Sequence, residues 1–166
     1  MATLLENGGA VELWGGWVLK LPPAYHQRNG DGLWSAWGAD WAVDVRIIEV
    51  AGQANGQAVP PEEMLGKELT VNVSGSGWVG VRKVLQETDN GRDVYRLAAN
   101  LAATNTAMSL WVSYFEAHQQ AFAEELMRNV VHSNYEHGLL WGGSGRYNGS
   151  ANGQERAFKS EGDNDT

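Results

Sequence analysis

The sequence contains no cysteine, which excludes disulfide bonds, thiolate metal ligands and cysteine nucleophiles. It also lacks any apolar run near the roughly 20 residues that a membrane-spanning helix requires. The first residues, MATLLENGGAVELW, have neither the basic start nor the apolar stretch and cleavage site of a signal peptide. These absences predict a cytoplasmic protein that has no membrane partner and folds without disulfides.

Positive charge is scarce. Twelve lysines and arginines face 20 acidic residues, so the formal net charge is −8. A negative field repels phosphate backbones unless a local basic patch overcomes it. The candidates for such a patch, Arg82, Lys83, Arg92 and Arg96, are interleaved with acidic residues. The sequence therefore predicts no nucleic-acid partner.

A G-x-G-x-x-G spacing, the pattern of a dinucleotide-binding loop, occurs at residues 75–80. Such a loop must follow a strand and open a helix, whose N-terminal amides hold the pyrophosphate. Here the glycines lead into WVGVRKVL, which is rich in β-branched residues. The spacing therefore indicates a chance match or a glycine-rich turn, and no cofactor is expected.

Histidines and carboxylates do not form a pattern typical of chemistry. His132 and His137 are five residues apart, where a helix would place a ligand pair four apart, and His118 lies at the other end of the predicted helix. Asp44 and Glu49 have odd spacing on one predicted strand and so point to opposite faces. No P-loop, H-E-x-x-H or nucleophile elbow occurs. The sequence favours a protein that binds no metal and is not an enzyme.

The chain length of 166 residues favours one domain, which can bury roughly 70% of its unfolded surface. Hydrophobic residues make up 43% of the chain, enough for a core. From residue 134 the composition shifts to glycine, serine and asparagine with scattered apolar residues. We therefore predict a domain over 1–133 and a flexible tail over 134–166.

Hydrophobic patterning predicts the elements of that domain. WAVDVRIIEVA alternates as a strand, and residues 78–115 form a three-strand meander with turns at DNG and ATN. A helix is predicted over 117–132, where apolar residues recur four apart, and a shorter one begins at the proline pair of VPPEEMLGKEL. The predicted fold class is α+β, with an antiparallel sheet of five to seven strands and both helices packed on it.

Eight tryptophans are the unusual feature of the composition. Trp41 and Trp111, on predicted strands, are assigned to the core. The segment LWSAW is ambiguous. Trp34, Trp37 and Trp41 are spaced three and four residues apart, which would place them on one face of a helix, but we favour a strand. Tryptophan is common at protein interfaces and stacks on flat ligands. We therefore predict an exposed binding patch of Trp34 and Trp37, with Trp78 as a third candidate.

The order of elements resembles the PsbP-like superfamily, which includes the Ran-binding Mog proteins and the bacterial DcrB-like domains. The matching segments are WVLKLPP, GADWAVDVRIIEVA, PPEEMLGKEL, the 78–115 meander and AFAEELMRNVVHS. The resemblance is one of pattern over residues 11–133, and it transfers no functional residue. It implies a non-catalytic domain that serves in binding or assembly.

Three functions remain open from the sequence. The leading hypothesis is a protein-interaction or assembly module of bacterial or phage origin, such as a chaperone or adaptor, that binds another protein or itself. The alternative is a domain that binds a small ligand or glycan through the three tryptophans. An enzyme that uses Asp44, Glu49 or His118 ranks third, because a shared cleft would be needed to bring these residues together.

Overall fold

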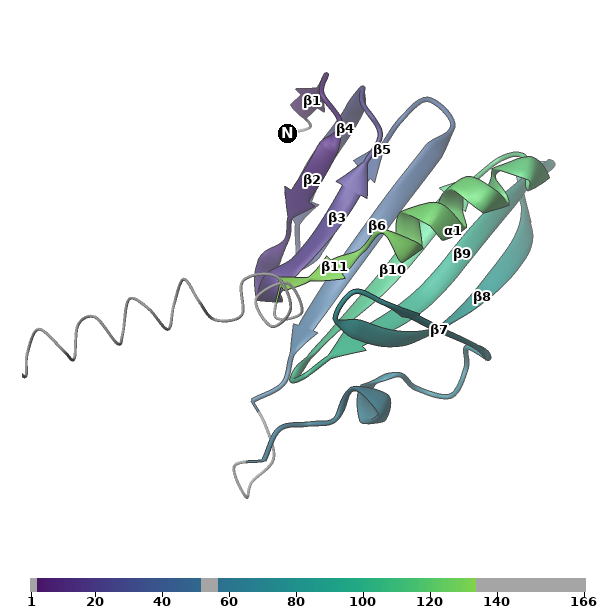
Figure 1. The fold of residues 1–166 in the computed structure, drawn as a ribbon. Coiled ribbons are helices and arrows are strands. Elements are labelled where there is room, and N and C mark those ends of the chain that lie inside the picture. Colours follow the sequence, from purple (N-terminus) through teal and green to yellow (C-terminus); the bar gives the residue numbers. More distant parts are fainter. Residues whose placement is uncertain (1–2, 52–56, 134–166) are drawn as a thin grey trace, which may run out of the picture.

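The computed structural model describes residues 3–51 and 57–133, in which two antiparallel β-sheets are accompanied by one α-helix (Figure 1). The eight strands of the large sheet are β1 (Thr3–Leu5), β4 (Tyr25–Gly30), β5 (Leu33–Trp37), β6 (Trp41–Glu49), β7 (Val71–Gly75), β8 (Trp78–Asp89), β9 (Arg92–Ala103) and β10 (Thr106–Tyr114). The small sheet contains β2 (Gly9–Glu12), β3 (Trp17–Leu21) and β11 (Val131–His132). The helix α1 spans Gln120–Arg128, and single 3-10 turns occupy Trp14–Gly16, Pro61–Met64 and Ala117–Gln119.

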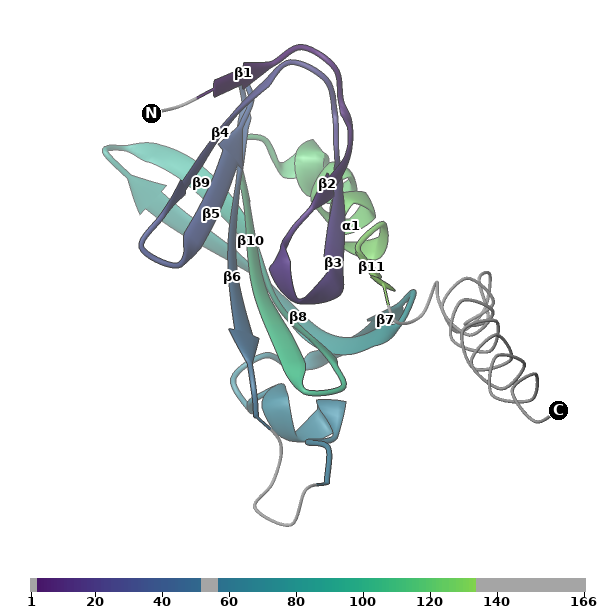
Figure 2. The same cartoon turned by 90° about the vertical axis from the view of Figure 1, so that its left-hand side faces the viewer.

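The strand order is β1-β4-β5-β6-β10-β9-β8-β7 in the large sheet and β11-β3-β2 in the small one. The helix α1 contacts β9 and β10 of the large sheet and β3 of the small one. Figures 1 and 2 show that α1 and the small sheet lie on the same side of the large sheet. We call this covered side the inner face.

The predicted fold class was wrong. The described chain is mostly sheet, with eight strands in the main layer and one short helix, instead of five to seven strands with two helices. The proline pair opens only the 3-10 turn Pro61–Met64. The C-terminal helix ends at Arg128 because the β-branched pair Val130 and Val131 favours extended backbone, and β11 then pairs with β3.

The predicted meander is confirmed. β8 and β9 are antiparallel neighbours, and the pair next to their turn is Asp89 and Arg92. β9 and β10 are also antiparallel neighbours, and the pair next to their turn is Ala103 and Thr106. The two connecting turns have positive φ at Asn90 (50°) and Asn105 (61°), the conformation that asparagine tolerates better than most residues. The turn residues therefore determine where this central part of the sheet reverses direction.

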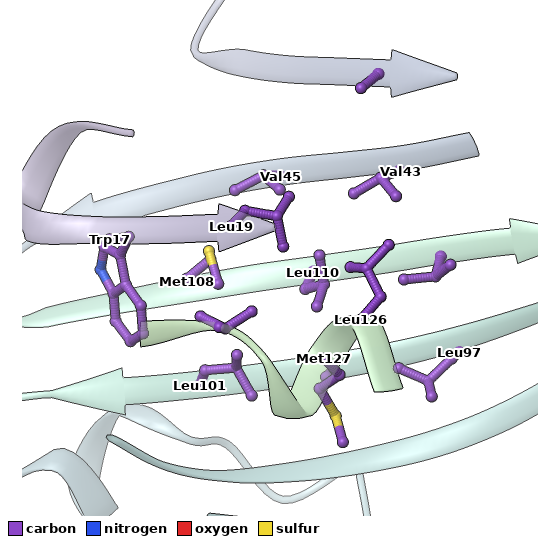
Figure 3. Packing of buried hydrophobic residues seen from close by; sticks show 14 of the residues in the cluster. Trp17, Leu19, Val43, Val45, Leu97, Leu101, Met108, Leu110, Leu126 and Met127 are labelled. Atoms are coloured by element: carbon purple, nitrogen blue, oxygen red, sulfur yellow. The ribbon is translucent and has the colours of Figure 1, made fainter. Parts of the chain in front are cut away.

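The core lies between the inner face and the elements that cover it (Figure 3). Alternation along β6 and β10 places Val43, Val45, Met108 and Leu110 on the inner face, and all four are fully buried. The helix contributes Leu126 and Met127, and β3 contributes Trp17 and Leu19. This burial of apolar side chains is the main stabilising contribution to the fold.

Within residues 3–51 and 57–133, no layer covers most of the opposite, outer face of the large sheet (Figure 2). A loop packs over one end of it, where Asn100 Nδ2 donates to the carbonyl oxygen of Leu65 at 3.1 Å. The register of the strands places the following side chains on this face: Trp37, Ala42, Asp44, Arg46, Ile48, Lys83, Leu85, Glu87, Arg92, Arg96, Ala98, Asn100, Ala107, Ser109, Trp111 and Ser113. The described residues therefore leave the outer face open to a partner.

No helix in the part of the chain that the structure describes is long and apolar enough to cross a membrane.

Candidate functional site

The three tryptophans predicted to bind a partner do not form one patch. Trp34 is 5% exposed and points to the inner face, whereas Trp37 is half-buried on the outer face and stacks on His26. Trp78 is 4% exposed, and its Nε1 donates to the carbonyl oxygen of Val130 at 2.8 Å. The expectation of an exposed Trp34–Trp37 pair is therefore corrected. Side chains alternate between the two faces of a strand, so residues three apart lie on opposite faces.

Trp41 and Trp111, both expected in the core, also differ from one another. Trp41 packs against the core beside Phe122 of α1, with ring centroids 5.9 Å apart. Trp111 points the other way and lies half-buried at the centre of the outer face. Its direct neighbours there are Asp44 of β6 and Ala98 of β9. Trp111 is thus the tryptophan that the sequence analysis missed as a site residue.

A hollow of about 420 Å³ opens in the outer face beside Trp111. It is lined by residues 98–100 of β9, by Leu85 of β8 on one side of that strand, by Trp111 of β10 on the other, and by residues 66–69. We call it the outer hollow. The small side chain of Ala98 creates this space, because a larger residue at that position would fill it.

Cations outnumber anions among the unpaired charges around the outer hollow, where Lys67 and Glu68, both in its lining, offset one another. Arg46 and Lys83 are exposed on the outer face and form no ion pair within the described residues. Of the acidic side chains of this face, Glu87 lies 3.8 Å from an arginine of β9. Asp44 accepts a hydrogen bond from the neutral hydroxyl of Ser35 at 2.6 Å and has no ion-pair partner within the described residues. A chain with net charge −8 therefore presents unpaired cations here.

The histidines considered as metal ligands are far from equivalent. His118 is exposed in the 3-10 turn before α1, His132 is 2% exposed, and His137 lies outside the described residues. Among the described residues, no group of three histidine or carboxylate side chains is placed to hold a metal ion. The glycines of residues 75–80 connect β7 to β8 in a tight turn, with φ of 86° at Gly77, and no helix follows them.

His132 is the buried histidine of the described residues. Its Nε2 lies 3.0 Å from the carbonyl oxygen of Gly15, so Nε2 carries the proton, and the lone pair of Nδ1 has no partner among the described residues. Burial lowers the pKa of His132, and the hydrogen bond to Gly15 opposes that effect only in part. Glu49 is the other titratable residue that lines the adjacent hollow of about 230 Å³.

We expect His132 to make the protein less stable in acid. Its folded pKa lies below the value of 6.5 for the unfolded chain, so the unfolded state binds more protons below neutral pH. Stability is therefore present above pH 6.5 and decreases as the pH falls toward the lowered folded pKa. The slope due to this one proton is at most about 1.4 kcal/mol per pH unit.

Urea unfolding at about pH 7.5 and about pH 5 measures this effect. The His132→Gln variant can keep a donor to Gly15 but does not titrate, so its loss of stability between the two pH values should be smaller. The matched control is His118→Gln, which removes an exposed histidine and should leave the acid sensitivity unchanged. Equal acid sensitivity in the wild type and His132→Gln would contradict the assignment.

Comparisons with known proteins support the fold and assign no family. Neither protein-family models nor curated proteins gave a match. Among solved structures, the chain is similar to a protein from Bacteroides thetaiotaomicron VPI-5482 whose crystal structure was determined at 1.50 Å resolution. The TM-score is 0.57 at 11% sequence identity, over 70% of this chain and 45% of that one. This chain therefore spans less than half of that protein, and the likeness concerns the fold alone.

Proposed function

We propose that this protein is a non-catalytic protein-interaction module whose outer face binds an acidic segment of another protein. The observation that carries the proposal is the outer hollow beside Trp111, in a sheet face that no layer of the described chain covers. Tryptophan is among the residues most often responsible for binding energy at interfaces, and such residues sit beside pockets that exclude water. An apolar side chain of the partner would occupy the hollow.

The chemistry of the partner follows from the surroundings of the outer hollow. Leu85, Ala98 and Trp111 offer apolar contact, which suits one aromatic or aliphatic anchor side chain. Arg46 and Lys83 remain unpaired nearby, and opposite charges on the partner would steer its approach and fix its orientation. An acidic segment with a single large apolar residue satisfies both requirements.

A peptide-display library selected on the full chain tests this proposal. We expect the selected peptides to share acidic residues around one large apolar residue, and their affinity to decrease as salt is raised. Substituting Ala98→Leu fills the outer hollow and should weaken these peptides by about tenfold or more.

The matched control is Ala42→Leu, which adds the same atoms to the outer face on β6, two strands away from Ala98. This variant should keep full affinity. The proposal fails if no peptides are enriched, if the enriched peptides are basic or lack an apolar residue, or if Ala98→Leu and Ala42→Leu bind them equally well.

A further inference from the structure

A second hollow of about 420 Å³ lies where β2 and the 3-10 turn after it face β4 and β5. Both sheets therefore contribute to its lining. The residues that matter for the argument are Glu12, Trp14, Gln27, Arg28, Asn29 and Trp34. We call it the Trp14 hollow. It shares no lining residue with the outer hollow.

Two indole rings border the Trp14 hollow. Trp14 is 39% exposed, which makes it one of the few large apolar side chains of the described residues that face solvent. Trp34 is 5% exposed, and its Nε1 has no protein acceptor within the described chain. Among the described residues, the side-chain polar atoms that have neither a hydrogen-bond partner nor contact with solvent are Tyr114 Oη and His132 Nδ1. Trp34 Nε1 is not one of them, so solvent reaches it. The hollow is therefore bordered by aromatic surface, and one of the two bordering residues keeps an indole N–H without a protein acceptor in the described chain.

Four polar side chains complete the lining, and none of them forms a side-chain hydrogen bond or ion pair with the rest of the described chain: Glu12, Gln27, Arg28 and Asn29. Elsewhere the structure uses comparable groups internally, as in the contacts of Asn100 with Leu65 and Ser109. The side chains of the Trp14 hollow thus keep amide, carboxylate and guanidinium groups available to a ligand.

We infer that the Trp14 hollow binds a neutral carbohydrate of about two sugar rings. A sugar ring has an apolar face of C–H groups and an edge of hydroxyl groups that both donate and accept hydrogen bonds. The indole of Trp14 fits the first, and the free polar groups around it fit the second. The charges of Glu12 and Arg28 cancel, which favours an uncharged ligand over a phosphate or a carboxylate.

The size of the Trp14 hollow agrees with this ligand class. Ligand pockets typically enclose about 300–1,000 Å³ and combine aromatic surface with a few polar groups that set orientation. A site near the lower end of that range accommodates a disaccharide and leaves longer chains to extend into solvent. This site would add a second binding activity to the module, independent of the outer face.

Nuclear magnetic resonance of the full chain tests the inference, because each of the eight tryptophans gives one indole N–H signal. The probes are maltose, cellobiose, lactose and N,N′-diacetylchitobiose, each at up to about 10 mM, where millimolar affinities are detectable. We expect at least one sugar to shift the indole signals of Trp14 and Trp34, which are assigned from Trp14→Phe and Trp34→Phe. The Trp14→Ala variant should bind that sugar at least about tenfold more weakly.

Two controls distinguish sugar binding in the Trp14 hollow from a solvent effect and from binding in the outer hollow. Glycerol, a polyol without a ring face, should leave both signals unchanged at the same concentration. The Ala98→Leu variant, filled in the outer hollow, should bind the sugar normally, so failure of the protein-interaction proposal leaves this result intact. The inference is overturned if none of the four sugars moves the Trp14 and Trp34 signals, if glycerol moves them equally, or if Trp14→Ala keeps full affinity.

Discussion

Substituting Trp17→Ala is expected to lower the free energy of unfolding by about 3–5 kcal/mol, the usual cost of removing a buried aromatic side chain. Trp17 is 0% exposed and lies at the start of β3, in the cluster of buried side chains between β3 and the large sheet (Figure 3). Its Nε1 donates to Thr106 Oγ1 at 3.0 Å, and its ring meets His132 edge-on at 4.9 Å. Removing the ring leaves a cavity and deprives Thr106, itself buried, of its donor.

Urea unfolding followed by circular dichroism measures this loss without depending on tryptophan emission. The Trp14→Ala variant removes an exposed ring from the 3-10 turn just before β3 and should lower the free energy of unfolding by less than about 1 kcal/mol. Trp17→Phe keeps most of the apolar volume and should fall between the two. If Trp17→Ala proves no more destabilising than Trp14→Ala, Trp17 is not part of the core that joins the two sheets.

The central sheet was predictable because local signals agreed there with the final structure. Alternating apolar residues and asparagine-containing turns define β8, β9 and β10, and both signals depend only on neighbours in the sequence. β1 and β4 were missed because TLL and YHQRNG show no alternation of apolar residues. β4 pairs with β5 through a local hairpin at Asp31 and Gly32, whereas the pairing of β1 with β4 joins residues more distant in the sequence, such as Thr3 and Gln27.

The C-terminal helix shows how tertiary pairing overrides a helical pattern. Phe122, Leu126 and Val130 recur four residues apart, which predicted a helix to residue 132. The structure ends α1 at Arg128 and leaves the backbone N–H of His132 to donate to the carbonyl oxygen of Ser76 at 2.9 Å. The pattern could not reveal that this short stretch would join β3.

The sequence could have predicted that Trp111 lies on the outer face, but it could not have predicted the outer hollow. On β10, the buried residues Met108, Leu110 and Val112 alternate with Ser109 and Trp111, so the parity of the strand already placed Trp111 on the side opposite the core. The outer hollow depends on the loop over β9 and on a small residue in a neighbouring strand. No local pattern encodes that combination.

Trp78 gives the second large effect that we expect. It was predicted as a binding residue, but its contacts are those of a side chain that holds the end of the described chain in place. The ring packs on Gly75, where an added Cβ would clash with it, and Nε1 donates to the carbonyl oxygen of Val130. The adjacent Ser76 bridges to Val131 and accepts the backbone N–H of His132.

We therefore expect Trp78→Ala to lower the free energy of unfolding by about 3–5 kcal/mol. The same change should remove the hydrogen-exchange protection of the His132 amide, because β11 loses its anchor on the β7–β8 turn. Gly75→Val, which displaces the ring without deleting it, should reproduce the loss of protection at this amide. Trp78→Phe keeps part of the ring volume and leaves Val130 without its donor, at a cost of at least about 1–3 kcal/mol.

The two possible roles of Trp78 make opposite predictions. If Trp78 is a structural residue, substituting it should change the free energy of unfolding and the hydrogen exchange of the His132 amide, while a folded Trp78→Phe variant keeps its affinity for the selected peptides. As a binding residue, it should change that affinity with little effect on unfolding. The buried position of the ring and its bond to Val130 favour the first result. If Trp78→Ala leaves the free energy of unfolding unchanged, the structural role is wrong and the original prediction of Trp78 as a binding residue is favoured.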